Sequence, residues 1–312
     1  MRSIVCAIIA CAVNVSALWA GAPWGEVLPE GRSWILLYSV SMWGSEKYDN
    51  SGNKAPIIAG AETEGRELHY LAEYAYGLSE ALTVGMIIPY GTRSLEVKPT
   101  VIPKQERTGA GDIKLGGQYR YRKSENCVLT FRSAAKLPTG RVDDPDDPRD
   151  IELGTGQAYV EFTNFSDHYF AQKQWVASTM VRVNIQLPAE YKTTRSRVAT
   201  SGSDYTKDPG DELWLAAGLE RKNAFVQGLS ASMRAEVRYD DEDNYSSLSS
   251  SYDQLRETGT KGELFFVQPE IKYSAYKTHK IPARLYANYR IPVIGKNNYV
   301  ANRLEIGCDI FF

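Results

Sequence analysis

Residues 303–312 read Arg-Leu-Glu-Ile-Gly-Cys-Asp-Ile-Phe-Phe, and this stretch decides the fold class. Its apolar side chains share one face: Leu304, Ile306, Cys308, Ile310 and Phe312. The opposite face carries Arg, Glu and Asp. Since side chains alternate between the two faces of an extended chain, the stretch is predicted to form an amphipathic β-strand.

The same period-2 alternation recurs along the whole chain. It is found near residues 33–43, 66–77, 81–92, 110–122, 127–137, 157–165, 174–187, 211–221, 226–239, 263–276, 282–291 and 301–312. Each segment is about as long as a tilted membrane-spanning strand, which takes roughly 9–11 residues. Residues 166–173 are ambiguous between strand and turn. Pro269 lies inside a segment and predicts a bulge or an irregular stretch there.

The connections between these segments alternate in length. Short ones are expected at 77–80, 124–126, 166–168, 222–225 and 277–280, long ones near 44–65, 93–109, 138–156, 188–210 and 240–262, and an intermediate one at 292–300. Outer-membrane barrels have short periplasmic turns and long outer loops. The pattern therefore predicts an all-β chain, a closed antiparallel transmembrane β-barrel of about 12 strands over residues 21–312, with both termini in the periplasm.

Aromatic residues favour a membrane barrel over a soluble β-protein, because they gather at strand ends on the apolar faces. Tyr76, Tyr121, Tyr273 and Phe312 are expected at the periplasmic end, and Tyr90, Tyr239 and Tyr289 at the other. Two such belts are typical of outer-membrane barrels. The middle of the apolar faces holds almost no charge, as expected where Arg or Lys facing lipid costs roughly 2–4 kcal/mol. In a soluble core, aromatic residues are expected to be scattered along the strands.

The composition of the chain excludes other classes. With 312 residues, a formal charge of -2 and a sequence pI of about 6.0, the chain has no basic excess that favours nucleic acid. A mean hydropathy of -0.37 is too polar for a bundle of membrane-spanning helices. We therefore expect outer-membrane lipids, and no nucleic acid, as partners.

Residues 1–20 have the pattern of a secretory signal peptide, with one Arg followed by an apolar run that ends in small residues. Cleavage after Ala17 or after Ala20 fits equally well. A single membrane anchor and a lipoprotein attached at Cys11 are the other interpretations. Removal of the leader changes the formal charge to -3 and leaves Cys127 and Cys308, which are expected as free thiols on non-neighbouring strands.

The polar faces of the predicted strands carry charges of both signs. We predict that the following residues line the lumen: Glu67, Glu73, Arg120, Arg132, Glu161, Arg182, Arg234, Glu236, Glu270, Arg284, Arg290 and Glu305. Twelve strands lie between barrels of eight, filled by side chains, and barrels of 16–18 with an aqueous channel, so a modest lumen is expected. A near balance of charge argues against strong ion selectivity. The other interpretation is that these residues only stabilise one another.

The expected loop 138–156 contains five clustered carboxylates, Asp143, Asp144, Asp146, Asp147 and Asp150. Carboxylate oxygens bind Ca²⁺, but the spacing does not match an EF-hand. We therefore favour a rigid exposed loop over a metal site. Folding of this loop into the barrel mouth as a gate is a further interpretation.

Catalysis has little support in the sequence. His69 is predicted on an inward face, and His168 and His279 in short turns, with Asp167-His168 away from any Ser on a strand. No phosphate loop, zinc spacing or dinucleotide fingerprint is present. We predict that the protein is not an enzyme and needs no cofactor or metal.

Three glycine-containing motifs carry a family resemblance. They lie at 109–121 (GAGDIKLGGQYRY), 134–140 (AAKLPTG) and 153–157 (LGTGQ). In this order they resemble the meta-pathway phenol-degradation family of outer-membrane transporters. The resemblance covers about 50 residues, and it implies uptake of small, often aromatic or apolar compounds without assigning ligand residues. The end at Phe312 is similar to the C-terminal signature that the barrel-assembly machinery reads.

These observations lead to one functional hypothesis and one alternative. We expect a bacterial outer-membrane channel for passive uptake of small molecules, possibly aromatic or apolar, whose identity the sequence does not give. The expected partners are membrane lipids, the barrel-assembly machinery through Phe312, and the small permeant. The alternative is a non-transporting surface barrel whose long loops bind a partner or support the envelope.

Overall fold

The computed structural model describes residues 26–57, 62–98, 104–141, 151–192, 204–246 and 260–312. Twelve strands form one closed antiparallel barrel. They are β1 (Ser33–Tyr48), β3 (Glu62–Ser79), β4 (Leu82–Lys98), β6 (Ile113–Lys123), β7 (Cys127–Leu137), β8 (Tyr159–Phe170), β9 (Trp175–Gln186), β12 (Glu212–Arg221), β13 (Leu229–Asp240), β15 (Gly262–Ser274), β16 (Ala283–Lys296) and β17 (Tyr299–Phe311). Each matches one predicted segment, so the predicted barrel is confirmed.

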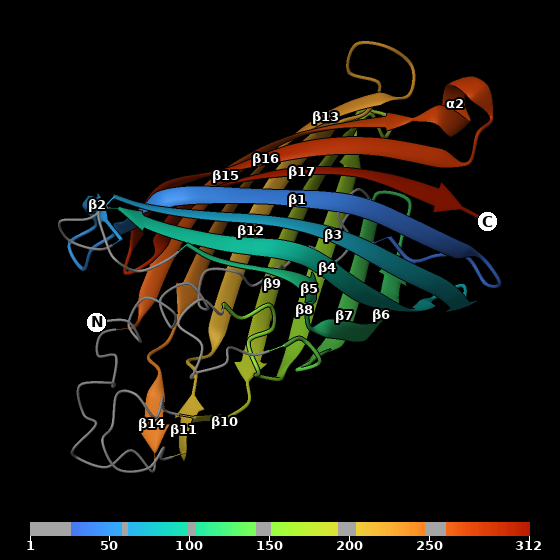
Figure 1. The fold of residues 1–312 in the computed structure, drawn as a ribbon. Coiled ribbons are helices and arrows are strands. Elements are labelled where there is room, and N and C mark those ends of the chain that lie inside the picture. The colour runs from blue at the N-terminus through green and yellow to red at the C-terminus, as the bar shows by residue number, and fades with distance from the viewer. Residues whose placement is uncertain (1–25, 58–61, 99–103, 142–150, 193–203, 247–259) are drawn as a thin grey trace, which may run out of the picture.

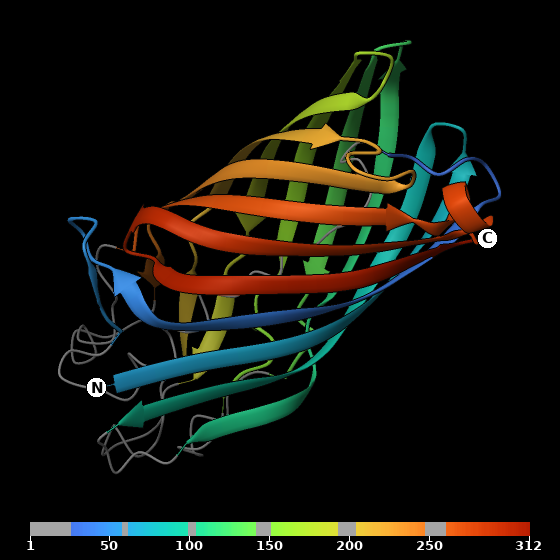
Figure 2. The same cartoon turned by 90° about the horizontal axis from the view of Figure 1, so that it is seen from above.

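The barrel is closed by the pairing of β1 with β17. Trp34 lies opposite Phe311 at one end of this seam, and Lys47 lies opposite Tyr299 at the other. Figure 2 shows the two strands side by side. The barrel must close because lipid offers no hydrogen bonds. Every backbone N–H and C=O of the wall therefore needs a partner in a neighbouring strand.

The two ends of the barrel differ. One end carries the tight turns and α2 (Ala275–His279), and the C-terminus lies there (Figure 1). The opposite end carries the extensions β2 (Lys54–Pro56) and β5 (Gln105–Ala110). It also carries a separate three-stranded sheet of β10 (Ala189–Lys192), β11 (Asp204–Asp208) and β14 (Asn244–Ser246). No helix among the described residues is long and apolar enough to span a membrane.

Several predicted boundaries were wrong because the strands continue beyond the length that a bilayer requires. The expected loop at 44–65 is shortened by the extension of β1 and β3. The expected loop at 292–300 is absent, since only Asn297 and Asn298 separate β16 from β17. Asn297 has a φ of 48°, in the left-handed region that Asn adopts more readily than most residues.

The turn expected at 166–168 was also misplaced. Strand β8 runs on to Phe170, and the turn follows at 171–174, with positive φ at Ala171, Gln172 and Lys173. Pro269 keeps its register with Met233 on β13, while the ladder to β16 has a gap between Val267 and Glu270. This gap is the irregular stretch expected for a residue without an N–H.

The outer surface is apolar, with exposed Leu, Ile, Val, Phe and Tyr side chains that alternate with buried ones. The inner face is mostly charged, but it is not uniformly polar. In β1 the inward side chains of Trp34, Leu36 and Val40 are apolar and at most 1% exposed. The expectation that apolar side chains face outward and charged side chains face inward therefore holds for most of the wall but fails at β1.

Two other predictions concern the ends and the thiols. The predicted signal peptide at 1–20 lies outside the described residues. Cys127 and Cys308 are both free, on β7 and β17, which confirms the expectation of free thiols on strands that do not pair.

Candidate functional site in the barrel interior

The structure places the twelve predicted lining residues on the inward parity of their strands. Nine are buried: Glu67, Glu73, Arg132, Glu161, Arg182, Glu236, Glu270, Arg290 and Glu305. The other three, Arg120, Arg234 and Arg284, are of intermediate exposure. Arg120 lies apart from the rest, because its guanidinium donates to the Glu80 carbonyl oxygen at a turn.

A four-residue charged cluster surrounds Glu161 on β8. Its Oε1 lies 2.6 Å from Arg132 Nη2 and 3.6 Å from Arg182 Nε, and its Oε2 lies 3.9 Å from Lys114 Nζ. All four side chains are buried, and Thr163 also donates its hydroxyl to Glu161 at 2.9 Å. Three strands thus direct cations at one carboxylate. Lys114 was missing from the predicted set, although its alternation with Leu115 placed it on the inward face.

The remaining predicted residues form smaller pairs rather than one site. Glu236 lies 2.9 Å from both Arg234 and Arg290. Glu270 lies 3.0 Å from Lys272, which also contacts Glu220 at 3.0 Å. Towards the α2 end, Arg284 contacts Asp309 at 2.5 Å, and further along β17 Arg303 contacts Glu305 at 2.5 Å. Charges of both signs therefore follow the inner wall.

Aromatic rings lie among these cations. Trp214 stacks on Phe266 with ring centroids 6.2 Å apart, and both rings are buried on the inner face. The guanidinium groups of Arg182, Arg238 and Arg290 lie 5.8, 5.2 and 5.8 Å from the Trp214 ring. Cations near the face of an indole are stabilised by its quadrupole. The sequence analysis did not predict this inward aromatic surface.

A second chain of contacts joins the opposite wall to a segment inside the barrel. Glu67 on β3 lies 2.8 Å from Arg93 on β4, and its other oxygen lies 3.1 Å from His69 Nε2. Arg93 in turn lies 3.6 Å from Glu152. Since Glu152 follows strand β7 and precedes β8, this ion pair ties a connecting segment to the inner wall.

The connecting segment at 151–155 folds into the barrel. Ile151, Glu152 and Leu153 are less than 9% exposed, although they belong to no strand. The described end of the expected loop at 138–156 is therefore an inward-folded segment, while a gate formed by this loop stays a prediction. The five clustered aspartates lie within residues 142–150, outside the described part of the chain.

Asp112 anchors the inward-folded segment. Its Oδ1 accepts the backbone N–H of Gly140 at 2.9 Å, and its Oδ2 accepts the N–H of Thr155 at 3.0 Å. Lys136 Nζ lies 3.4 Å from Oδ2 and donates to the Thr155 hydroxyl. These residues come from all three motifs on which the family resemblance was based. The motifs thus form one tertiary contact.

A further segment, residues 26–32, lies across the α2 end of the barrel as the dark blue trace in Figure 2. Val27 and Leu28 are each 5% exposed. The Leu28 N–H donates to Thr83 Oγ1 at 2.8 Å, and the Gln118 side chain donates to the Glu26 carbonyl oxygen at 2.8 Å. This segment packs against the inner wall at the α2 end, and the sequence analysis assigned it no role.

The prediction for His168 needs a correction. It lies in strand β8 rather than in a turn, and its Nε2 is 2.8 Å from Ser166 Oγ. Both side chains lie on the outward parity of the strand. Asp167 between them is fully buried on the other face, 2.5 Å from the Ser178 hydroxyl. The neighbouring acid therefore does not orient His168.

Comparison with solved structures identifies the class of this fold. The barrel superposes on an outer membrane channel from Pseudomonas putida F1 with a TM-score of 0.73 and 15% identity, over 94% of this chain and 100% of that chain. The chain has the fold of a bacterial outer-membrane β-barrel. The translocator domain of the autotransporter NalP from Neisseria meningitidis has a TM-score of 0.51 and 10% identity, over 92% of this barrel and 90% of that chain. No family model and no curated protein matches the sequence.

Proposed function

We propose that this outer-membrane barrel is a channel for the passive passage of small molecules. The observation that carries the proposal is the charged lining of the inner wall combined with the inward-folded segment at 151–155. A wall whose inner side chains carry charges of both signs keeps water inside, and a segment anchored on that wall reduces the free width of the interior. The twelve predicted lining residues would be the groups that a permeant passes, Arg120 only at the periplasmic turn.

The proposed permeants are small and apolar or aromatic. The motif resemblance implies such compounds, and the inner wall offers surfaces of the right chemistry. One apolar cluster is built around Trp34, Leu36 and Tyr38, and a second around Trp214 and Phe266.

A second candidate function follows from the sheet of β10, β11 and β14. It lies outside the barrel wall, at the end opposite to α2 (Figure 1). An ordered sheet in this position suits a surface barrel that binds a partner or supports the envelope. This candidate requires no passage through the barrel.

Reconstitution separates the two candidates. The folded barrel is inserted in liposomes and in planar bilayers, with heat-unfolded protein as the control. The channel proposal expects swelling in small neutral solutes that declines with solute size, together with discrete conductance steps. A barrel that shows heat-modifiable migration on a gel but never passes solutes supports the surface function instead.

A further inference from the structure

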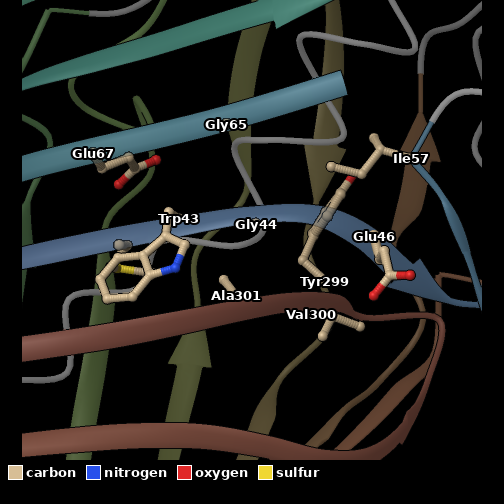
Figure 3. A pocket seen from close by; sticks show the side chains of 10 residues that line it. Trp43, Gly44, Glu46, Ile57, Gly65, Glu67, Tyr299, Val300 and Ala301 are labelled. Carbon is tan, nitrogen blue, oxygen red and sulfur yellow. The ribbon is translucent and has the colours of Figure 1, made fainter. Parts of the chain in front are cut away.

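An apolar hollow lies in the barrel wall where β1 meets β17. Its cavity volume is about 50 Å³, and it is open on one side. It is lined by Met42, Trp43, Gly44, Glu46, Ile57, Gly65, Glu67, Tyr299, Val300 and Ala301 (Figure 3). Its exposed lining is almost entirely carbon. Such a surface stands out beside an inner wall that is mostly charged.

The hollow lies where the β1–β17 register is distorted and where two glycines face each other across the neighbouring β1–β3 pair. The β1–β17 register shifts between Trp43 and Glu46, and Gly44 pairs with Gly65 on β3. Gly44 is required by the backbone, since a Cβ there would lie 2.5 Å from the Val300 carbonyl oxygen. The close approach of the strands therefore explains this glycine.

Gly65 has no such requirement. Its nearest neighbour to an added Cβ is the Gly44 carbonyl oxygen at 3.8 Å, an ordinary contact distance, and its φ is not positive. Glycine in a strand costs roughly 0.5–1 kcal/mol relative to Ala. The structural consequence of glycine at position 65 is the space of the hollow, which a larger side chain would fill.

The chemistry of the lining defines what fits. Met42, Ile57 and Val300 offer aliphatic contacts, and Trp43 and Tyr299 contribute aromatic residues. The Glu67 carboxylate is already engaged by Arg93 and His69. Apolar cavities stay dry and accept apolar molecules, and Met adapts to their shape. A molecule in this hollow would therefore bind through apolar contacts rather than through hydrogen bonds.

We infer that the hollow at the β1–β17 seam binds a small uncharged apolar molecule, which it encloses only in part. Glu67 lines it and reaches Glu152 of the inward-folded segment through Arg93, so the occupant sits beside the segment that narrows the barrel. Binding does not depend on passage, but a role as a stopping point for a permeant rests on the proposed function.

The test uses bromobenzene, a heavy-atom quencher of tryptophan emission, titrated into the folded barrel in detergent. Gly65→Leu fills the hollow. Gly117→Leu is the matched control, because Gly117 on β6 has a similarly open Cβ position, 3.6 Å from the Thr83 carbonyl oxygen, away from the seam. Trp43→Phe assigns the signal to the tryptophan that lines the site.

We expect saturable quenching in the wild type and in Gly117→Leu. In Gly65→Leu and Trp43→Phe we expect only the linear quenching that comes from partition into detergent. If Gly65→Leu fails the heat-modifiability test, Gly65→Val replaces it. A folded filling variant whose quenching curve matches the wild type overturns the inference.

Conductance of the same preparations keeps this inference separate from the channel proposal. Saturable quenching in a barrel that never conducts supports the binding site and contradicts the channel. Conductance by a barrel without saturable quenching contradicts the binding site and leaves the channel proposal in place.

Discussion

The Asp112 carboxylate accepts the backbone N–H of Gly140 at 2.9 Å, which joins the start of β6 to the segment that follows β7. The approach is so close that a Cβ at Gly140 would lie 2.7 Å from the Gly154 Cα atom. Gly140 of the second motif and Gly154 of the third are therefore explained by one packed junction, with Asp112 at its centre.

Asp112→Ala is expected to release the inward-folded segment. It removes the acceptor for two backbone N–H groups and the partner of the buried Lys136. A hydrogen bond to a charged group contributes about 1.5–3 kcal/mol, so the ratio of released to anchored segment rises roughly 10- to 150-fold for each bond lost. Larger or noisier conductance steps in planar bilayers check this. Asp49→Ala, in an exposed turn, is the control, and identical traces for all three proteins contradict the prediction.

Glu161→Gln is expected to destabilise the barrel and to change its ion preference. The substitution leaves Arg132, Arg182 and Lys114 without their shared anion. Breaking a buried pair in this way costs about 3–5 kcal/mol. Urea unfolding in vesicles measures the stability, and reversal potentials should shift towards anions.

Glu96→Gln provides the comparison for Glu161. Glu96 pairs with Lys98 at 2.9 Å, but both side chains are more than a third exposed. Exposed pairs contribute about 0–1 kcal/mol, so little change is expected. Equal loss of stability in the two variants would contradict a special role for the buried cluster.

Gly77→Ala is expected to displace the segment at 26–32. An added Cβ would lie 2.1 Å from the Pro29 carbonyl oxygen. Displacement exposes Leu28, whose burial contributes about 1.5–3 kcal/mol, and frees the Arg32 carbonyl oxygen from the Gly77 N–H. Trypsin cleavage after Arg32 should become faster and conductance should rise. Gly117→Ala, on the outer face, should change neither.

Ser166→Ala and His168→Ala are expected to leave ester hydrolysis at the level of the detergent blank. The Ser166 hydroxyl contacts His168 at 2.8 Å, but the adjacent Asp167 points to the other side of the wall. Release of fatty acid from phospholipid micelles measures this. Activity in the wild type that either substitution abolishes would show that the protein is a hydrolase after all.

Phe312→Ala is expected to lower the amount of folded barrel in the outer membrane several-fold, because we propose that the assembly machinery recognises this residue. Phe312 is 59% exposed and therefore contributes little to packing. Heat-modifiable protein in membrane fractions measures assembly, and refolding in detergent is the control that should not change. Normal membrane yield argues against this recognition.

The strands of the barrel wall could be predicted from the sequence because period-2 alternation directly indicates a sheet with one apolar and one polar face. Their ends could not, because β3 and β4 continue past the bilayer with the same alternation that they have inside it. β1 was also misleading: Trp34-Ile35-Leu36-Leu37 is apolar on both parities, so the sequence does not indicate that its inner face is apolar.

The interior was predicted by residue type but not by arrangement. Alternation placed Arg132, Glu161 and Arg182 on one side of the wall, yet their convergence depends on the pairing of β7, β8 and β9. The junction around Asp112 joins residues far apart in the chain, and the hollow beside Gly65 is a space rather than a side chain. Neither has a local sequence pattern from which it can be predicted.

The seam between β1 and β17 also bears on how the barrel is made. An open form of this sheet is not stable in lipid. Until Phe311 at the end of β17 pairs with Trp34 on β1, both edge strands present unsatisfied backbone groups to lipid. The ring that this last pairing completes spans nearly all of the described chain, so its formation has a high entropic cost and is slow. Substitutions that weaken the seam should therefore delay insertion more than they alter the finished protein.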